Sequence, residues 1–220
     1  MSALAIHAAT SRPLFRSITI SREYGSGGAE IAKRLADRLG WKLVDDCLLG
    51  EIARQANVDP ETARRYDERP NPWFDRLVKA IWHGGYEGAA TRIEASACDA
   101  DHIAQLWTRL IHQSAEAGGA VIVGRGGQCI LRDRRDAFHV LVQAPFEVRI
   151  ENLRRLLGLA AGLEILTRDT DRRRAAYLRR YFDEDWKNPQ LYHLIVNSTI
   201  GLDCAVEAVL TAAALAGPCS

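Results

Sequence analysis

The segment ITISREYGSGGAEIAKRLADRLGWKLVDD, residues 18–46, predicts a strand, a glycine-rich loop, a helix and a second strand in direct succession. The first strand, Ser17–Ser21, runs straight into the glycines. The helix that follows carries its apolar residues on one face and ends at Gly40, a residue suited to a helix C-cap. The second strand is expected over Trp41–Val44. This succession is the repeating unit of a parallel α/β sheet.

Similar units continue along the 220-residue chain. Further strands are expected over three segments: Ala120–Val123, His139–Gln143 and Leu191–Val196. Further helices are expected over Asp101–Ala117, Thr167–Phe182 and Leu202–Leu215. The sequence therefore predicts an α/β fold with a parallel sheet of about five strands flanked by helices.

The glycine-rich loop is the strongest functional signal. Glycines let the backbone approach an anion, and the free amides at the start of the next helix favour phosphate. The residues expected to cradle phosphates are Ser21, Gly25, Ser26, Gly27 and Gly28.

Two nucleotide-binding folds compete for this loop. Gly25-Ser26-Gly27 supplies the start of a dinucleotide GxGxxG pattern, and Asp45 lies at the distance expected of a ribose contact. Glu30, however, stands where that pattern needs a third small residue. The alternative is a P-loop, although the strict GxxxxGK[ST] pattern is absent.

Residues 18–46 resemble the start of cytidylate kinases without a gap. The resemblance continues in GRG at 124–126, DRRR at 171–174 and NSTIGL at 197–202, and it covers most of residues 17–215. It implies a P-loop kinase-type domain over 17–215, with a helical acceptor lobe inserted near 58–100 and an arginine-rich lid near 158–188. It also implies ATP and Mg²⁺ as cofactors, and CMP or dCMP as the acceptor.

The chain departs from that family at the loop. Gly28 occupies the place of the loop lysine that bridges the donor's terminal phosphates, and Arg22 stands at the loop's first glycine. We therefore expect Arg22 to supply the missing charge. The chain resembles a divergent, lysine-lacking branch described as cytidylate kinase-like.

Other charged residues complete the predicted site. Arg125 follows a buried strand and is expected to hold the acceptor phosphate, while Gly126 replaces the family's aspartate and removes a base contact. Lid arginines are expected to neutralise the transferring phosphoryl group: Arg172, Arg173 and Arg174. Asp45 is a candidate substrate-binding residue, which would hold a substrate hydroxyl or help to place Mg²⁺. A solvated arginine face remains the alternative for the lid.

Composition restricts the remaining possibilities. The net charge of +1 provides no general attraction to nucleic acid or membrane, and no apolar run is long enough to span a bilayer. The five cysteines are odd in number and form no CxxC pair, which indicates free thiols in a reducing compartment. Residues 1–16 lack a secretory signal and are expected to form a flexible tail. We expect a cytoplasmic monomer or weak homodimer whose partners are nucleotides.

Three functional readings thus stand beside one another. The first is a nucleoside monophosphate kinase-like enzyme that transfers the γ-phosphoryl group of ATP to CMP, dCMP or a related acceptor. The second is a non-catalytic nucleotide sensor on the same fold, suggested by the absent lysine and aspartate. The third is a kinase of another small acceptor. A nicotinamide enzyme is a further alternative and would bind NAD more tightly than ATP.

Overall fold

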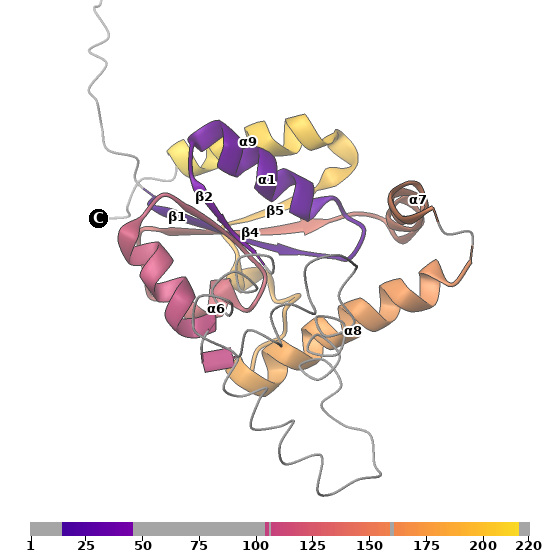
Figure 1. The fold of residues 1–220 in the computed structure, drawn as a ribbon, viewed down its shortest axis with the longest axis horizontal. Helices are drawn as coiled ribbons and strands as arrows, with labels where there is room; N and C mark the ends of the chain where they lie inside the picture. The colour runs from indigo at the N-terminus through magenta and orange to yellow at the C-terminus, as the bar shows by residue number, and fades with distance from the viewer. Residues whose placement is uncertain (1–14, 46–103, 106, 159–160, 216–220) are drawn as a thin grey trace, which may run out of the picture.

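A computed structural model of the protein describes residues 15–45, 104–105, 107–158 and 161–215. Its centre is a five-stranded sheet in the order β2-β3-β1-β4-β5, and every strand pairing is parallel (Figure 1). The strands are β1 (Ser17–Arg22), β2 (Lys42–Val44), β3 (Ala120–Val123), β4 (Ala137–Gln143) and β5 (Leu194–Asn197). The predicted P-loop kinase-type α/β fold is confirmed.

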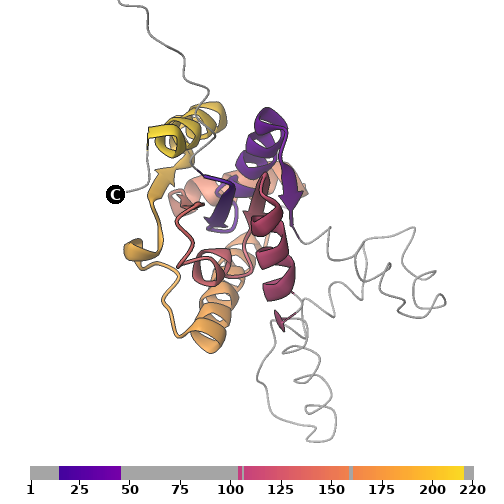
Figure 2. The ribbon, with the colours of Figure 1, turned by 90° about the vertical axis from the view of Figure 1, so that its left-hand side faces the viewer.

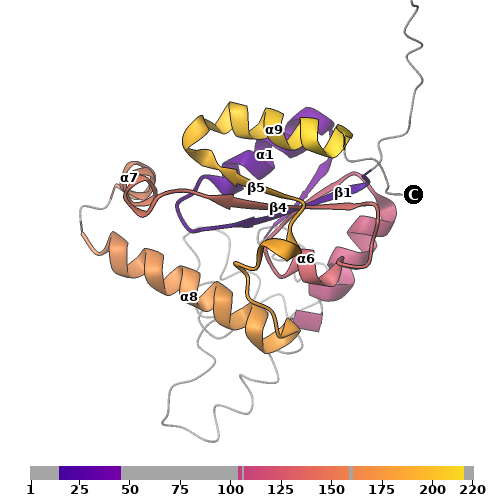
Figure 3. The ribbon, with the colours of Figure 1, turned by 180° about the vertical axis from the view of Figure 1, so that it is seen from behind.

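Helices cover both faces of this sheet. The first face carries α1 (Gly28–Leu39) and α9 (Leu202–Leu215), which lie side by side in Figure 2. The second face carries a helix over residues 107–117 and the short α6 (Gly127–Ile130). Beyond the strand ends lie α7 (Phe146–Leu157) and the long α8 (Leu163–Phe182), which crosses beneath the second face in Figure 3.

Two apolar cores hold these layers together. On the first face, strand residues such as Ile20 and Val140 pack against Ile31 and Leu35 of α1 and Val206 of α9, and each of these is fully or almost fully buried. On the second face, a separate cluster is built around Trp107, Ile111 and Ile122. Strand residues that alternate between the two cores explain why the predicted strands are so apolar.

The second face of β1 is polar but buried. Ser17, Thr19 and Ser21 alternate along it with exposures of 6% or less, and Thr19 Oγ1 lies 2.8 Å from Nδ1 of His139 on β4. Burial is the main cause that lowers the pKa of His139 to about 4, and the neighbouring charge of His193 lowers it further. His139 is therefore neutral in the folded protein at pH 7.

The predicted elements match the observed ones with small differences. Helix α8 begins four residues earlier than expected, and the last strand is shifted to Leu194–Asn197 behind a 3₁₀ turn over Pro189–Leu191. Phe15 and Arg16, which the sequence assigned to the tail, belong to the folded domain: Phe15 packs on the core and is 8% exposed, and the exposed Arg16 donates its backbone N–H to Asp136 O. The rest of the expected tail and the insert near 58–100 lie outside the described residues.

Candidate functional site

The glycine-rich loop joins β1 to α1 at the carboxyl edge of the sheet. Gly25 and Gly27 have φ angles of 83° and 79°, in the left-handed region that favours glycine. Gly27 caps α1 and has no side chain to accept hydrogen bonds from the first helical amides. Those amides and the positive end of the helix dipole therefore suit an anion.

Serine hydroxyls brace the loop from inside. Ser26 is fully buried, and its Oγ donates to Glu23 O at 2.8 Å and lies 3.2 Å from Val142 O on β4. The Oγ of Ser21 donates to Gln128 Oε1 at 3.0 Å. In this state both side chains hold the loop against the sheet, so what the loop offers a phosphate is its backbone.

A cluster of buried charges ties the loop to α7 and α8. Arg149 on α7, only 8% exposed, lies 2.5 Å from Asp171 on α8 and 3.7 Å from Glu23 in the loop. Asp171 Oδ1 accepts the backbone N–H of Tyr24 at 2.9 Å, and Arg149 donates to Tyr24 O at 3.3 Å. Lys187 adds a second cation, 3.4 Å from Glu23. The lid helix is thus joined to the predicted phosphate loop through a nearly solvent-excluded network.

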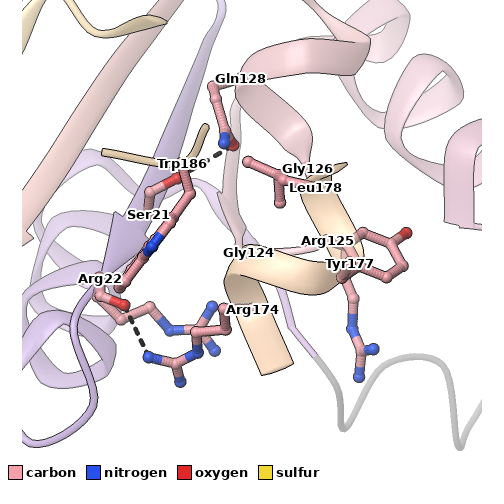
Figure 4. Close-up of a pocket in the computed structure, with 10 residues that line it drawn as sticks. All are labelled: Ser21, Arg22, Gly124, Arg125, Gly126, Gln128, Arg174, Tyr177, Leu178 and Trp186. Carbon is pink, nitrogen blue, oxygen red and sulfur yellow. Dashed lines mark hydrogen bonds between the residues drawn. The ribbon is translucent and has the colours of Figure 1, made fainter. Parts of the chain in front are cut away.

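Arg174 makes a second contact between lid and loop. Its Nη1 donates to the backbone oxygen of Arg22 at 2.7 Å, and its guanidinium lies over the Tyr24 ring, 5.7 Å from the centroid (Figure 4). Arg174 and Arg22 both line a pocket that opens to solvent. The pocket lies between the carboxyl ends of β1 and β3 and the inner face of α8.

This pocket combines cations with apolar and amide groups. Its wall consists of Ser21, Arg22, Gly124, Arg125, Gly126, Gln128, Arg174, Tyr177, Leu178 and Trp186. A hydrogen-bonded chain supports it from below: Gln128 Nε2 lies 3.4 Å from Tyr192 Oη, which donates to Trp186 O at 2.6 Å. Burial is the main cause that raises the pKa of Tyr192 to about 12, so this hydroxyl keeps its proton at pH 7.

The turn after β3 carries a strained arginine. Arg125 has a φ of 55°, which is uncommon for a residue other than glycine and is often found at functional sites. Its guanidinium lies over the Trp107 ring, 5.2 Å from the centroid, and Figure 4 shows it directed away from Arg22 and Arg174. The pocket therefore receives the Arg125 backbone and the base of its side chain in this state.

Two features favour glycine at the next position, 126: its φ of 70° lies in the left-handed region, and the ring of Phe182 lies close by. A Cβ added at Gly126 would lie 2.3 Å from Cε2 of Phe182, at the end of α8. The aromatic ring thus fills the space into which an aspartate at this position would project. The base contact expected of the family is absent here both in sequence and in space.

Other predicted site residues lie further from the pocket. Arg172 is 77% exposed and pairs with Asp169 on the outer side of α8 at 3.2 Å, whereas Arg173 is half-buried. Asp45 follows β2 at the same edge of the sheet. Of the three lid arginines, the structure brings Arg174 to the pocket.

The residues of the charge cluster were not anticipated from the sequence. Glu23, Arg149 and Asp171 lie on three separate segments, and each looks like an ordinary surface charge in its own helix or loop. Trp186 is likewise a residue that the sequence did not single out; it is 5% exposed and lines the pocket. In the sequence, the glycines at 124 and 126 are the features that indicate the close approach of other side chains, which the structure shows to be Arg22 and Phe182.

The described residues contain no group of three or more His, Cys, Asp or Glu able to hold a metal ion by themselves. Mg²⁺ in phosphoryl-transfer sites commonly binds through one or two carboxylates together with substrate phosphates. Asp45 supplies one carboxylate at the same edge of the sheet as the glycine-rich loop, with β3 between them, and one carboxylate is compatible with that mode. No helix within the described part of the chain is long and apolar enough to cross a membrane.

The strand order and the glycine-rich loop after β1 define a P-loop kinase-type fold with a cationic pocket beside that loop. The model of the cytidylate kinase-like family matches residues 17–200. The chain therefore belongs to the cytidylate kinase-like family. The comparison with curated proteins gave no match.

Solved structures agree on the fold. An uncharacterized protein from Eubacterium ventriosum ATCC 27560 superimposes with a TM-score of 0.62 at 19% identity, over 89% of this chain and 96% of that one. Shikimate kinase from Acinetobacter baumannii, in complex with shikimate, gives a TM-score of 0.51 at 15% identity, over 90% of this chain and 93% of the other. A sugar kinase from Janibacter sp. HTCC2649 gives a TM-score of 0.50 at 14% identity, over 92% of this chain and 96% of the other. At these identities the likeness concerns the fold alone.

Proposed function

We propose that the protein transfers the γ-phosphoryl group of ATP to a nucleoside monophosphate, with CMP and dCMP as the first acceptors to test. The observation that carries the proposal is the adjacency of two features. An amide-rich glycine loop starts α1, and an arginine-lined pocket opens beside it at the carboxyl edge of the sheet. Membership of a kinase-like family supports the same chemistry.

The residues divide between donor and acceptor. The amides from Gly25 to Gly28 would hold the donor phosphates, and Arg22 and Arg174 would neutralise the charge that spreads over the moving phosphoryl group. Arg125, after reorienting from Trp107, would hold the acceptor phosphate. The sequence predicts the same role for Arg172 and Arg173, but Arg172 is 77% exposed on the outer side of α8, so we assign the role to Arg174. Asp45 would hold Mg²⁺, which when bound neutralises the β- and γ-phosphate oxygens.

Phosphoryl transfer needs little else from the protein. An oxygen of the acceptor attacks the γ-phosphorus, the bond to the bridging oxygen breaks, and ADP leaves. The apolar side chains of Leu178 and Trp186 would exclude water that could compete with the acceptor. We also propose a cytoplasmic protein that acts as a monomer or weak homodimer, with no role for nucleic acid or membrane.

Two alternatives have specific support. Gly28 removes the loop lysine, which favours a nucleotide sensor that binds without turnover. Phe182 fills the space beside Gly126, which favours a kinase whose acceptor lacks a cytosine ring. Both alternatives keep the phosphate loop as a nucleotide site.

The test is a coupled assay of ADP formation with ATP against a panel of nucleoside monophosphates and small hydroxy acids. Arg125→Ala should lower kcat/KM for the acceptor, while Arg135→Ala, which removes an exposed arginine at the opposite, amino edge of the sheet, should leave it unchanged. Turnover with CMP or dCMP supports the proposal. Calorimetric binding of ATP without turnover on any acceptor would favour the sensor, and turnover restricted to hydroxy acids would favour the other kinase.

A further inference from the structure

Gly28 is a glycine that its own backbone does not require. It is the first residue of α1 and, unlike Gly25 and Gly27, it does not have a positive φ angle. The reason lies in its neighbour. A Cβ added at Gly28 would lie 2.5 Å from Cβ of Arg22, closer than real Cβ atoms come to other atoms, and 3.1 Å from its Cγ. Any side chain at position 28 therefore competes with the stem of Arg22.

The other end of Arg22 meets a second glycine. Its Nη1 lies 2.1 Å from the place where a Cβ at Gly124 would stand, at the end of β3. The side chain thus extends from the start of α1 to the turn after β3, and it lines the pocket along the way. The Arg174 bond to the Arg22 carbonyl oxygen fixes the backbone from which it extends. Figure 4 shows both guanidinium groups below the strand end.

We infer that Arg22 and Gly28 are a reciprocal exchange of the usual P-loop residues. A P-loop has glycine at its first position and, six residues later, a lysine that reaches the β- and γ-phosphates. Here the cation stands at the first position, and the glycine stands where the lysine would be. The two arrangements exclude each other, because a side chain at position 28 and the stem of Arg22 need the same space.

The exchange also changes where the charge is delivered. A lysine at position 28 would project from the start of α1. The Arg22 guanidinium instead lies against Gly124, between the glycine-rich loop and the turn after β3 that carries Arg125. A planar guanidinium pairs with two phosphate oxygens at once and keeps its charge. Arg22 is thereby assigned as the cation between donor and acceptor phosphates. This assignment rests on the proposed function, since it presumes that phosphates occupy the loop.

The exchange is tested with a double-mutant cycle of Arg22→Gly, Gly28→Lys and the combined variant. Two quantities are measured for each full-length protein: the unfolding temperature, and the affinity for Mg²⁺–ATP and for inorganic tripolyphosphate by calorimetry. Lys33→Ala is the matched control, because Lys33 lies on α1 with Gly28 and is an exposed cation that pairs with Asp37.

Arg22→Gly should lower the affinity for both ligands by about tenfold or more, as expected when a charge-assisted hydrogen bond is lost. Gly28→Lys alone should lower the unfolding temperature, because its side chain meets the Arg22 stem. In the combined variant the unfolding temperature should fall by less than the sum of the decreases in the two single variants. The combined variant should also regain most of the affinity for both ligands. The nearest remaining neighbour of a Cβ at position 28 would then be Val142, at 3.3 Å. Lys33→Ala should match the wild type.

Additive effects on unfolding temperature would overturn the steric part of the inference. Unchanged affinity in Arg22→Gly, with the wild type binding normally, would overturn the assigned role of the cation. If the wild type bound neither ligand, the proposed function would fall and the role of the cation with it. The unfolding temperatures would still decide whether residues 22 and 28 exclude each other.

Discussion

Replacing Arg149 with methionine should destabilise the protein strongly and loosen its phosphate loop. Methionine keeps the length of the aliphatic stem but removes the guanidinium, which lies over the Phe146 ring at 5.3 Å from the centroid, and with it the charge. Glu23 and Asp171, with side chains 9% and 15% exposed, would then lose a buried cation that lies 3.7 and 2.5 Å from them. Breaking a buried ion pair by removing one partner costs about 3–5 kcal/mol.

That cost converts into a measurable change in thermal stability. For a chain of this size each kcal/mol lowers the unfolding temperature by roughly 2–4 °C, so Arg149→Met should lower it by roughly 6–20 °C. The lower half of that range is favoured, because Lys187 stays 3.4 Å from Glu23 and Arg174 stays 3.7 Å from Asp171. Affinity for Mg²⁺–ATP should also fall, because Tyr24 loses the contact with Arg149 that holds the loop.

The assay is thermal unfolding followed by circular dichroism, with Arg154→Met as the matched control. Arg154 lies on the same helix, is about half exposed and pairs with Glu151, so its replacement should change the unfolding temperature by no more than about 2 °C. If Arg149→Met unfolded within 2 °C of Arg154→Met, the buried network would not be what fastens the loop to α7 and α8.

Three further predictions concern the turn, the lid and pH. Gly126→Asp should be destabilised because its side chain meets Phe182, and adding Phe182→Ala should recover part of the lost unfolding temperature; a Gly126→Asp protein as stable as the wild type would argue against this contact. Arg174→Ala should weaken Mg²⁺–ATP binding measured by calorimetry, whereas Arg172→Ala, which is largely exposed, should not; equal losses would place both on the pocket side. Burial lowers the pKa of His139 in the folded protein from 6.5 to about 4, so the unfolded chain binds a proton at His139 more readily than the folded one. The free energy of unfolding should therefore be unaffected above pH 6.5 and should fall by about 3 kcal/mol as the pH falls to 4. Urea unfolding across that range should show a shallower loss in His139→Gln.

The sequence was sufficient for the sheet and the loop because both are local. Strand β3 is a short apolar run, and the glycines between β1 and α1 follow a strand directly and precede a helix, so each could be recognised without knowing which segments pack against it. The polar face of β1 was less predictable. Ser17, Thr19 and Ser21 are buried only because β4, α6 and their side-chain partners cover them.

The site depended on contacts between distant segments. The position of Phe182 over Gly126, and of Arg22 between Gly28 and Gly124, follows from how α8 and β3 approach the loop, which no local pattern encodes. The same is true of Arg149, which belongs to an amphipathic helix and becomes buried only when α8 and the loop close over it. A glycine without a conformational need, such as Gly28, is the sequence feature that could have indicated such an approach.

The central claim is that glycine amides and guanidinium groups, in place of a loop lysine, hold a nucleotide's phosphate chain. It is tested most directly by calorimetric titration of the wild-type, full-length protein with Mg²⁺–ATP at low salt, beside NAD under the same conditions. The account predicts one ATP bound per chain, weakened by added salt, and weaker binding of NAD. Absence of binding by any Mg²⁺–nucleotide, or tighter binding of NAD than of ATP, would contradict it.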